Sequence, residues 1–177
     1  MLVEVPSPAL IVLIGVAGSG KSTFAREHFL PTEIVSSDVC RALVCDDEAD
    51  QSATADAFAL LRKILKLRLG RGKLAVVDAT SVQAWARAAL LEVAVRCGAP
   101  AVAIVFDLPE AVYLAQNRVR PNRMVEEAVI AKQAADLRAS LPGLEAEGFA
   151  AVHLFRSTED VEAARVIRGG WPQSDPA

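Results

Sequence analysis

The stretch "ALIVLIGVAGSGKS", residues 9–22, joins an apolar run to a glycine-rich turn. Residues 9–16 are apolar on both alternating faces, which predicts a parallel strand covered from both sides. The turn fits the pattern G-x-x-x-x-G-K-[ST], which binds phosphate when it lies between a strand and a helix. Gly15, Gly18 and Gly20 allow the backbone N–H groups to turn inward, so that these amides and the helix N-terminus form a cradle for phosphate oxygens.

Five polar side chains in or near this phosphate loop are candidate ligands for the nucleotide or its metal ion. Lys21 is expected to neutralise the β and γ phosphates of a nucleoside triphosphate, and the Ser22 hydroxyl is expected to bind Mg²⁺ or Mn²⁺. Thr23 is expected to reach the α-phosphate, and Ser19 belongs to the nucleotide-binding loop itself. Asp78 ends a later apolar run, where it either holds a metal-bound water or caps backbone amides. The sequence therefore predicts a protein that binds a nucleoside triphosphate.

Apolar runs alternate with amphipathic stretches along the chain, and this order predicts strands that alternate with helices. The expected strands are at residues 9–16, 33–37, 73–79, 100–108 and 150–155. The expected helices are at residues 21–29, 52–69, 83–96, 109–117, 124–140 and 158–168. The pattern predicts a three-layer α/β fold, a parallel five-stranded sheet flanked by helices, over residues 1–168, with residues 169–177 as a linker or disordered tail.

Length and composition restrict the class of protein. A chain of 177 residues is typical of one domain with one core. Its apolar stretches are too short to span a membrane, and no Lys or Arg precedes the first of them, unlike in a secretory signal. Three cysteines without a C-x-x-C pair indicate reduced thiols, so we expect a cytoplasmic protein with no membrane partner. The net charge of −3 gives no overall attraction for a polyanion such as nucleic acid, so any such partner must be bound by a local basic patch.

The segment "VSSDVCR", residues 35–41, places a carboxylate and a guanidinium three residues apart. On a helix, Asp38 and Arg41 would share one face, at the edge of the sheet where α/β proteins bind ligands. A kinase that phosphorylates an alcohol needs a carboxylate to orient the hydroxyl and accept its proton, and an arginine to hold the acceptor. The simpler interpretation is an N-capping aspartate paired with a surface arginine. Gln51, in the acidic loop that follows, is expected to reach an acceptor base or sugar.

Phosphate loops occur in GTPases, motor ATPases and kinases, so other segments must separate these classes. The chain has no N-K-x-D stretch to read guanine, and Asp78 is followed by Ala79 rather than by the glutamate typical of motor ATPases. Residues 116–123, "QNRVRPNR", contain three arginines between two expected helices, as in the mobile lid of small P-loop kinases. A solvated basic turn is the alternative. The candidate nucleotide ligands in this lid are Arg118, Arg120 and Arg123.

Several motifs occur together in one order, namely "GVAGSGKSTFA", "VSSDVCRALVCDDEADQ", "GKLAVVDATSVQ", "VFDLPE" and "RPNRMVEEAVI". From about residue 10 to 165 the chain resembles the kinase domain of the bacterial polynucleotide kinase/phosphatase of RNA end repair. The resemblance implies an adenylate-kinase-like fold and transfer of the ATP γ-phosphate to a 5′-hydroxyl end of RNA or DNA. It also implies phosphatase and ligase modules as partners, in the same polypeptide or complex, and none of these fits within this chain.

The resemblance assigns roles to individual residues. Lys21 and Ser22 match the phosphate and Mg²⁺ contacts. Asp38 matches the general base, and Arg41 matches the contact to an acceptor phosphate. All four residues are therefore expected to line one site that binds ATP, the metal and the acceptor.

The lid matches the resemblance less completely. Arg120 and Arg123 match lid arginines, and Arg123 is also a catalytic candidate. Where related enzymes can carry a further lid arginine, this chain has Gln116, so either Arg118 replaces it or one contact is missing. Two other functions stay open from the residues alone: a small-molecule kinase acting on a sugar, nucleoside or antibiotic, and an ATP-binding module without an acceptor.

Overall fold

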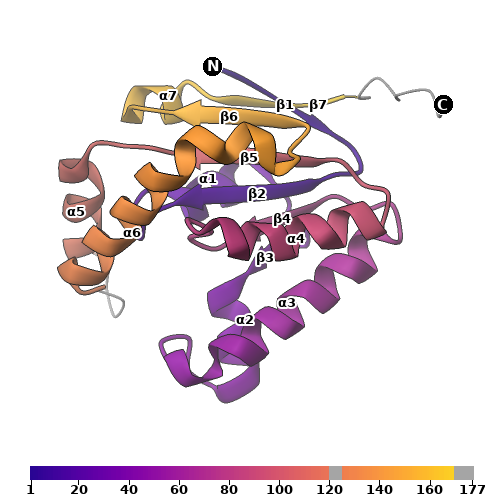
Figure 1. Cartoon of the computed structure of the whole chain (residues 1–177), viewed down its shortest axis with the longest axis horizontal. Helices are drawn as coiled ribbons and strands as arrows, with labels where there is room; N and C mark the ends of the chain where they lie inside the picture. The colour runs from indigo at the N-terminus through magenta and orange to yellow at the C-terminus, as the bar shows by residue number, and fades with distance from the viewer. Residues whose placement is uncertain (120–124, 170–177) are drawn as a thin grey trace.

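The computed structural model describes residues 1–119 and 125–169, with strand β2 (Leu10–Gly15) at the centre of the main sheet (Figure 1). The strands of this sheet are parallel and lie in the order β3-β4-β2-β5-β6. The other four are β3 (Ile34–Ser36), β4 (Ala75–Asp78), β5 (Ala101–Phe106) and β6 (Ala151–Phe155). The predicted α/β fold, a parallel five-stranded sheet flanked by helices, is confirmed.

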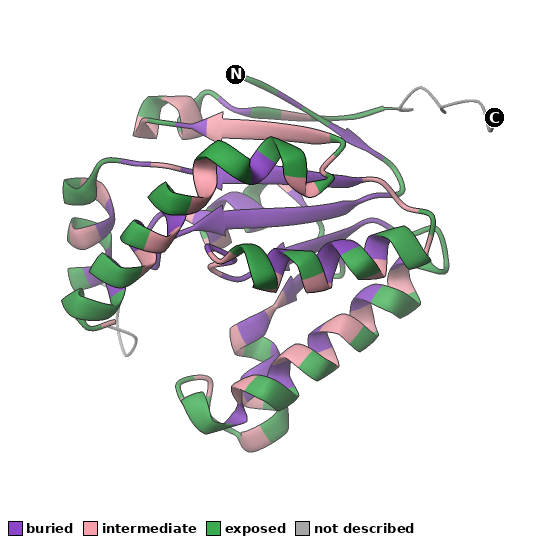
Figure 2. Ribbon diagram, viewed as in Figure 1, coloured by how far each residue is buried: buried purple, intermediate pink, exposed green. Residues whose placement is uncertain are grey.

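Three long helices cover one face of the sheet. Leu61 of α3, Leu90 of α4 and Leu137 of α6 belong to one buried cluster with Val12 of β2. Figure 2 shows the central strands almost entirely buried and these helices buried on one side only. The α-helices are α1 (Lys21–His28), α2 (Ser37–Cys45), α3 (Thr54–Leu69), α4 (Ala84–Arg96), α5 (Glu110–Arg118), α6 (Glu127–Ser140) and α7 (Thr158–Glu162). Two 3₁₀ helices, η1 (Gln51–Ala53) and η2 (Leu141–Glu147), complete the set in the described residues.

The opposite face of the sheet is covered by α1 and by a second sheet that the sequence did not predict. Strands β1 (Leu2–Pro6) and β7 (Arg165–Gly169) pair in parallel, and Val3 and Val5 of β1 are buried in the same cluster as Phe24 of α1. The β1–β7 pair therefore covers part of this face beside α1.

The helix predicted over residues 158–168 is wrong in its second half. Helix α7 ends at Glu162, and residues 165–169 form strand β7 instead. Arg165 pairs with Leu2, at the other end of the chain. Local periodicity cannot reveal a partner at that distance in sequence, and here strand pairing outweighed the helical pattern. Gly169, predicted to begin a tail, belongs to β7, and residues 170–177 lie outside the described residues.

The strands of the main sheet all run in one direction, so β2, β3 and β4 end at the same edge, where α/β proteins bind ligands. The three cysteines form no disulfide, in agreement with the sequence prediction of free thiols. Within residues 1–119 and 125–169, none of the helices has both the length and the apolar composition needed to cross a membrane.

Candidate active site

The phosphate loop follows β2 directly, and α1 begins at Lys21. Gly18 and Gly20 have φ angles of 84° and 88°, a left-handed conformation that residues with side chains rarely adopt. A Cβ atom on Gly18 would lie 2.4 Å from the carbonyl oxygen of Tyr113 on α5. Glycine is therefore required at position 18 by both conformation and space, as expected for a loop whose backbone wraps around an anion.

Residues 15–23 form one wall of the cavity described below and are called the phosphate-loop wall. Contacts within the chain hold them in place. The backbone amide of Ala17 donates a hydrogen bond to Oε1 of Gln133 on α6 (2.9 Å). Lys21 is only 7% exposed, and its Nζ donates to the carbonyl oxygen of Val16 (2.8 Å). The loop is thus fixed by partners from its own backbone and from a helix more than a hundred residues away in sequence.

The α2 wall, residues 34–48, consists of β3, α2 and the loop that follows them. Ser36 caps α2, since its Oγ accepts a hydrogen bond from the amide three residues later. Just before this wall, the carboxylate of Glu33 accepts from Arg168 of β7 (2.7 and 2.8 Å) and from the Leu30 amide (2.9 Å). Burial alone would raise the pKa of Glu33, but these hydrogen bonds and the charge of Arg168 lower it below its usual value.

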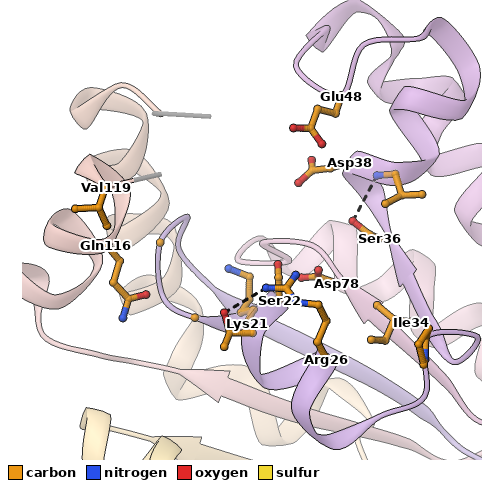
Figure 3. A pocket seen from close by; sticks show the side chains of 15 residues that line it. Lys21, Ser22, Arg26, Ile34, Ser36, Asp38, Glu48, Asp78, Gln116 and Val119 are labelled. Atoms are coloured by element: carbon orange, nitrogen blue, oxygen red, sulfur yellow. Dashed lines mark hydrogen bonds between the residues drawn. The ribbon is translucent and has the colours of Figure 1, made fainter. Parts of the chain in front are cut away.

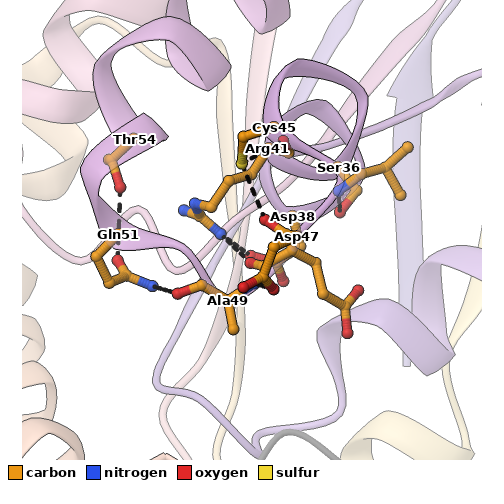
Figure 4. Close-up of polar contacts among 10 residues, drawn as sticks. Ser36, Asp38, Arg41, Cys45, Asp47, Ala49, Gln51 and Thr54 are labelled. Carbon is orange, nitrogen blue, oxygen red and sulfur yellow. Dashed lines mark hydrogen bonds and ion pairs between the residues drawn. The ribbon is translucent and has the colours of Figure 1, made fainter.

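Asp38 and Arg41 lie one turn apart on α2 and form an ion pair. Nη1 of Arg41 donates to Oδ1 of Asp38 (2.8 Å) and to the carbonyl oxygen of Glu48 (2.8 Å) (Figure 4). The Arg41 side chain is 7% exposed, and its Nε has no hydrogen-bond partner among the described residues. Arg41 therefore holds the Asp38 carboxylate and the following loop together.

A cavity of about 850 Å³ separates the phosphate-loop wall from the α2 wall. Its volume lies within the range of roughly 300–1,000 Å³ that is usual for small-molecule sites. Figure 3 shows Asp38 and Glu48 directed into it from the α2 wall, Lys21 and Ser22 near its base, and Gln116 on the opposite side. The sequence-predicted residues that line it are Gly18, Gly20, Lys21, Ser22, Thr23, Asp38 and Asp78.

Outside the lid, four predicted site residues do not line the cavity. Gly15 and Ser19 lie in the loop beneath it, where Ser19 is 1% exposed. Arg41 lies behind Asp38, and Gln51 is in η1, where its Nε2 donates to the carbonyl oxygen of Ala49 (3.2 Å). Of these four, Arg41 contacts a lining residue directly, since it donates to Asp38.

The lid segment is described only in part, because Arg120 and Arg123 lie outside the described residues. Gln116 and Arg118 are on α5, and Gln116 lines the cavity. Residues two apart on a helix do not share a face, and Arg118 is 66% exposed and donates to Oε1 of Glu127 (3.0 Å). The structure therefore does not bring Arg118 to the space that Gln116 faces.

A family model described as "AAA domain" matches residues 10–141. This match covers most of the chain. The chain belongs to this AAA-domain family. Comparison with curated proteins finds no match.

Several solved structures share the fold of this AAA domain. A chain of the Pnkp1/Rnl/Hen1 RNA repair complex matches with a TM-score of 0.66 and 23% identity, over 77% of this chain and 46% of its own length. A putative kinase from Chloroflexus aurantiacus matches with a TM-score of 0.58 and 14% identity, over 87% and 91%. A sugar kinase from Janibacter sp. matches with a TM-score of 0.58 and 18% identity, over 84% and 85%. The AAA domain thus has a P-loop kinase-like fold and spans less than half of the repair-complex chain.

The donor atoms at the base of the cavity fit a magnesium ion with a nucleoside triphosphate. The Ser22 hydroxyl and the Asp78 carboxylate line the same cavity, and Mg²⁺ prefers oxygen ligands of this kind, completed by water and phosphate oxygens. In the described part of the AAA domain, no cluster of three or more His, Cys, Asp or Glu side chains is suited to hold a metal by itself. A metal here would therefore depend on the nucleotide for part of its ligands.

Sequence reasoning missed several residues at this site. Arg26 lines the cavity and lies four residues after Ser22 on α1. Because residues four apart share one face of a helix, the sequence could have predicted that Arg26 faces the same space as Ser22. Glu48 also lines the cavity, although the sequence indicated only Gln51 as a candidate from this acidic loop. Gln133 gave no signal, because its contact with Ala17 depends on how α6 packs against the sheet.

Proposed function

We propose that this chain is an ATP-dependent polynucleotide kinase that transfers the γ-phosphate of ATP to a 5′-hydroxyl end of RNA or DNA. The observation that carries the proposal is one cavity with a phosphate loop on one wall and a carboxylate, Asp38, on the facing wall. An enzyme that phosphorylates an alcohol needs both, because the phosphate must be held in line with a hydroxyl whose proton has an acceptor.

The phosphate-loop wall binds the donor in this proposal. Its backbone amides and Lys21 neutralise the charge on the β and γ phosphates, and Thr23 lies where the α-phosphate would pass. Ser22 and Asp78 would hold Mg²⁺ or Mn²⁺, which neutralises further phosphate charge when bound. Arg120 and Arg123 complete the donor site from the lid in this proposal, and both lie outside the described residues. Arg118 donates to Glu127 of α6 instead.

The α2 wall activates the acceptor. Asp38 orients the hydroxyl and takes its proton as the new P–O bond forms and the bond to the departing ADP oxygen breaks. Arg41 keeps the Asp38 carboxylate aimed into the cavity, since it binds both Asp38 and the Glu48 carbonyl. Gln51 begins η1, directly after this loop. In this proposal it contacts the part of the acceptor that lies beyond the reacting sugar.

A nucleic-acid acceptor is supported by the sequence motifs and by the fold shared with a chain of an RNA repair complex. That chain is about twice as long as the matched region. We therefore propose that phosphatase and ligase activities are supplied by other modules, joined to or associated with this kinase.

A small-molecule kinase is the second candidate, and the charge of the cavity favours it. Asp38, Glu48 and Asp78 outnumber the described cations Lys21 and Arg26 in the lining, and carboxylates repel a phosphodiester. The fold is also shared with a sugar kinase over most of both chains.

An acceptor screen with γ-labelled ATP tests these proposals. We expect label transfer to oligonucleotides with a 5′-hydroxyl and none to the same oligonucleotides bearing a 5′-phosphate. Transfer to sugars or antibiotics but not to oligonucleotides would replace the first proposal with the second. Slow release of inorganic phosphate without transfer to any acceptor would instead indicate an ATP-binding module.

A further inference from the structure

A groove between α3 and α4 lies outside the candidate active site. It has a volume of about 590 Å³, and its lining residues fall between positions 59 and 66 and between positions 89 and 97. We call it the α3–α4 groove. The charged residues that line it are the cations Arg62, Lys63, Lys66 and Arg96 and the carboxylate Glu92. Glu92 forms an ion pair with Arg96, so the groove carries a local positive charge although the whole chain has a net charge of −3.

The three cations on α3 are not neutralised by the chain. In residues 1–119 and 125–169, no carboxylate forms an ion pair with any of them. A solvated helix face is usually stabilised by carboxylates three or four residues from its cations, but no acidic residue stands between Asp56 and Asp78. Arg62 and Lys66 are instead like charges four residues apart, which repel each other. A bound polyanion would relieve this repulsion.

Trp85 extends the groove-facing stripe of α4. It lies four residues before Ala89, and Ala89, Glu92 and Arg96 all line the groove. This spacing keeps the four residues on one face of the helix. The Trp85 side chain is 73% exposed, so its ring is available to another molecule. Cations beside an exposed aromatic ring are the combination that binds single-stranded nucleic acid, whose phosphates pair with the cations and whose bases stack on the ring.

Both helices begin at the ligand-binding edge of the sheet. Helix α4 follows β4, whose last residue, Asp78, lines the active-site cavity, and α3 follows η1 and leads back to the start of β4. The helices meet near their C-terminal ends, where Sγ of Cys97 lies 3.9 Å from the carbonyl oxygen of Lys66. Figure 1 shows them diverging toward their N-terminal ends. The groove therefore opens toward the edge of the sheet that carries the cavity.

We propose that the α3–α4 groove binds the phosphodiester backbone of single-stranded RNA or DNA, with Trp85 stacked on one of its bases. The choice of nucleic acid as the partner rests on the proposed function, in which the 5′ end of the same strand enters the cavity. An acidic polypeptide would match the charge of the groove but would leave the exposed indole without a base to stack on. The groove thus retains the body of the strand, while Asp38 acts on its end.

Fluorescence anisotropy with a labelled strand of about 20 nucleotides that already carries a 5′-phosphate tests binding without catalysis. Lys63→Ala/Lys66→Ala should weaken binding roughly 10-fold or more, and should lower the slope of log Kd against log salt by about 1.4, because two phosphate contacts are lost. Trp85→Ala should weaken binding by about 5- to 100-fold and leave the salt slope unchanged, because stacking releases no counterions.

Two control variants change the same surface outside the groove. Arg71→Ala/Lys73→Ala removes an equal charge from exposed positions just after α3, and Val95→Ala shortens an exposed apolar side chain on α4. Both should bind the strand as the native chain does. Equal weakening by the two double variants would mean attraction to the general charge of the chain and would overturn the inference. Displacement of the strand by decaglutamate, with no effect of Trp85→Ala, would overturn it in favour of an acidic polypeptide.

Label transfer from ATP to 5′-hydroxyl oligonucleotides of increasing length separates this inference from the proposed function. We expect kcat/KM to rise with acceptor length, and Lys63→Ala/Lys66→Ala to lose most of this gain. Transfer that does not depend on the groove residues, with equal strand binding by all variants, would overturn the inference and leave the proposed function. Groove-dependent binding without transfer to any oligonucleotide would support the inference and overturn the function. Circular dichroism confirms that each variant is folded.

Discussion

Backbone conformation and close packing shape the phosphate-loop wall, whereas a side-chain ion pair fixes the α2 wall across the cavity. On the first, a Cβ on Gly18 would meet the Tyr113 carbonyl at 2.4 Å, and the Ala17 amide is bonded to Gln133. On the second, Val39 is 56% exposed, and the ion pair of Arg41 with Asp38 fixes the carboxylate.

Because of this difference, the two walls should tolerate substitutions to different extents. A strained backbone in close contact leaves few substitutions open, as suits the triphosphate-binding role that we propose for the first wall. Side-chain contacts on an exposed helix can be altered without disturbing the sheet, as suits the acceptor-binding role that we propose for the second. The α2 wall is therefore the part of the site where specificity can vary within the fold.

The largest effect is expected on the phosphate-loop wall. Lys21→Ala should reduce phosphate transfer by on the order of 1,000-fold, because the charge that stabilises the transferring phosphoryl group is lost. Single-turnover kinetics with labelled ATP measures this, and thermal unfolding controls for the bonds that Lys21 makes to Val16 and Ser19. Near-native transfer by a folded variant would remove the basis of the whole assignment.

On the α2 wall, Asp38→Asn should lower kcat by about 100-fold with little change in ATP affinity, because an amide cannot accept the proton. The amide oxygen can still accept from Arg41, so the helix and its loop should keep their geometry. Steady-state kinetics and ATP titration measure the two quantities. Asp46→Asn is the matched control, since Asp46 is exposed and has a φ of 60°, which asparagine tolerates. Loss of ATP binding in Asp38→Asn would assign this carboxylate to the metal instead.

Gly18→Ala tests whether backbone packing sets the phosphate-loop wall. The added Cβ meets the Tyr113 carbonyl and forces a strained φ, so ATP should bind more than about 10-fold more weakly and the free energy of unfolding should fall by about 2 kcal/mol or more. Gly72→Ala is the control, because Gly72 has a φ of 65° but open space around it, and it should cost only about 1 kcal/mol. Urea unfolding and ATP titration compare them. An equal loss of unfolding free energy in the two variants would mean that the cost comes from the strained φ angle and not from the contact with α5.

The smallest effect concerns the base of the α2 wall. Glu33→Gln should lower the free energy of unfolding by about 1 kcal/mol at pH 7, because it removes the charge paired with Arg168. The pKa of Glu33 is lowered in the folded chain, so its contribution is complete above the unfolded-state pKa of roughly 4.3 and is lost as pH falls through the lower folded-state pKa. Urea unfolding of both proteins from pH 7 to pH 3 should show the difference shrinking; a difference that is constant with pH would exclude this linkage.

Much of the fold could be predicted because its signals are local. The glycines and Lys21 of the phosphate loop, the apolar strands and the helical periods each lie within a few residues of one another. The same locality explains the errors. Strand β7 was predicted as helix because its partner β1 is at the other end of the chain. The direction of the Arg118 side chain, toward Glu127 on α6, likewise depends on another element.

The sequence by itself determined the phosphate loop, the alternation of strands with helices and the one-turn spacing of Asp38 and Arg41, since each depends on steric and hydrogen-bonding preferences of neighbouring residues. The tertiary structure alone decided that Arg41 is buried, that Arg26 lines the cavity and that Gln133 contacts the phosphate loop. Side-chain direction depends on which elements pack together and which space is left between them. That outcome is a property of the whole core, and no short stretch of sequence contains it.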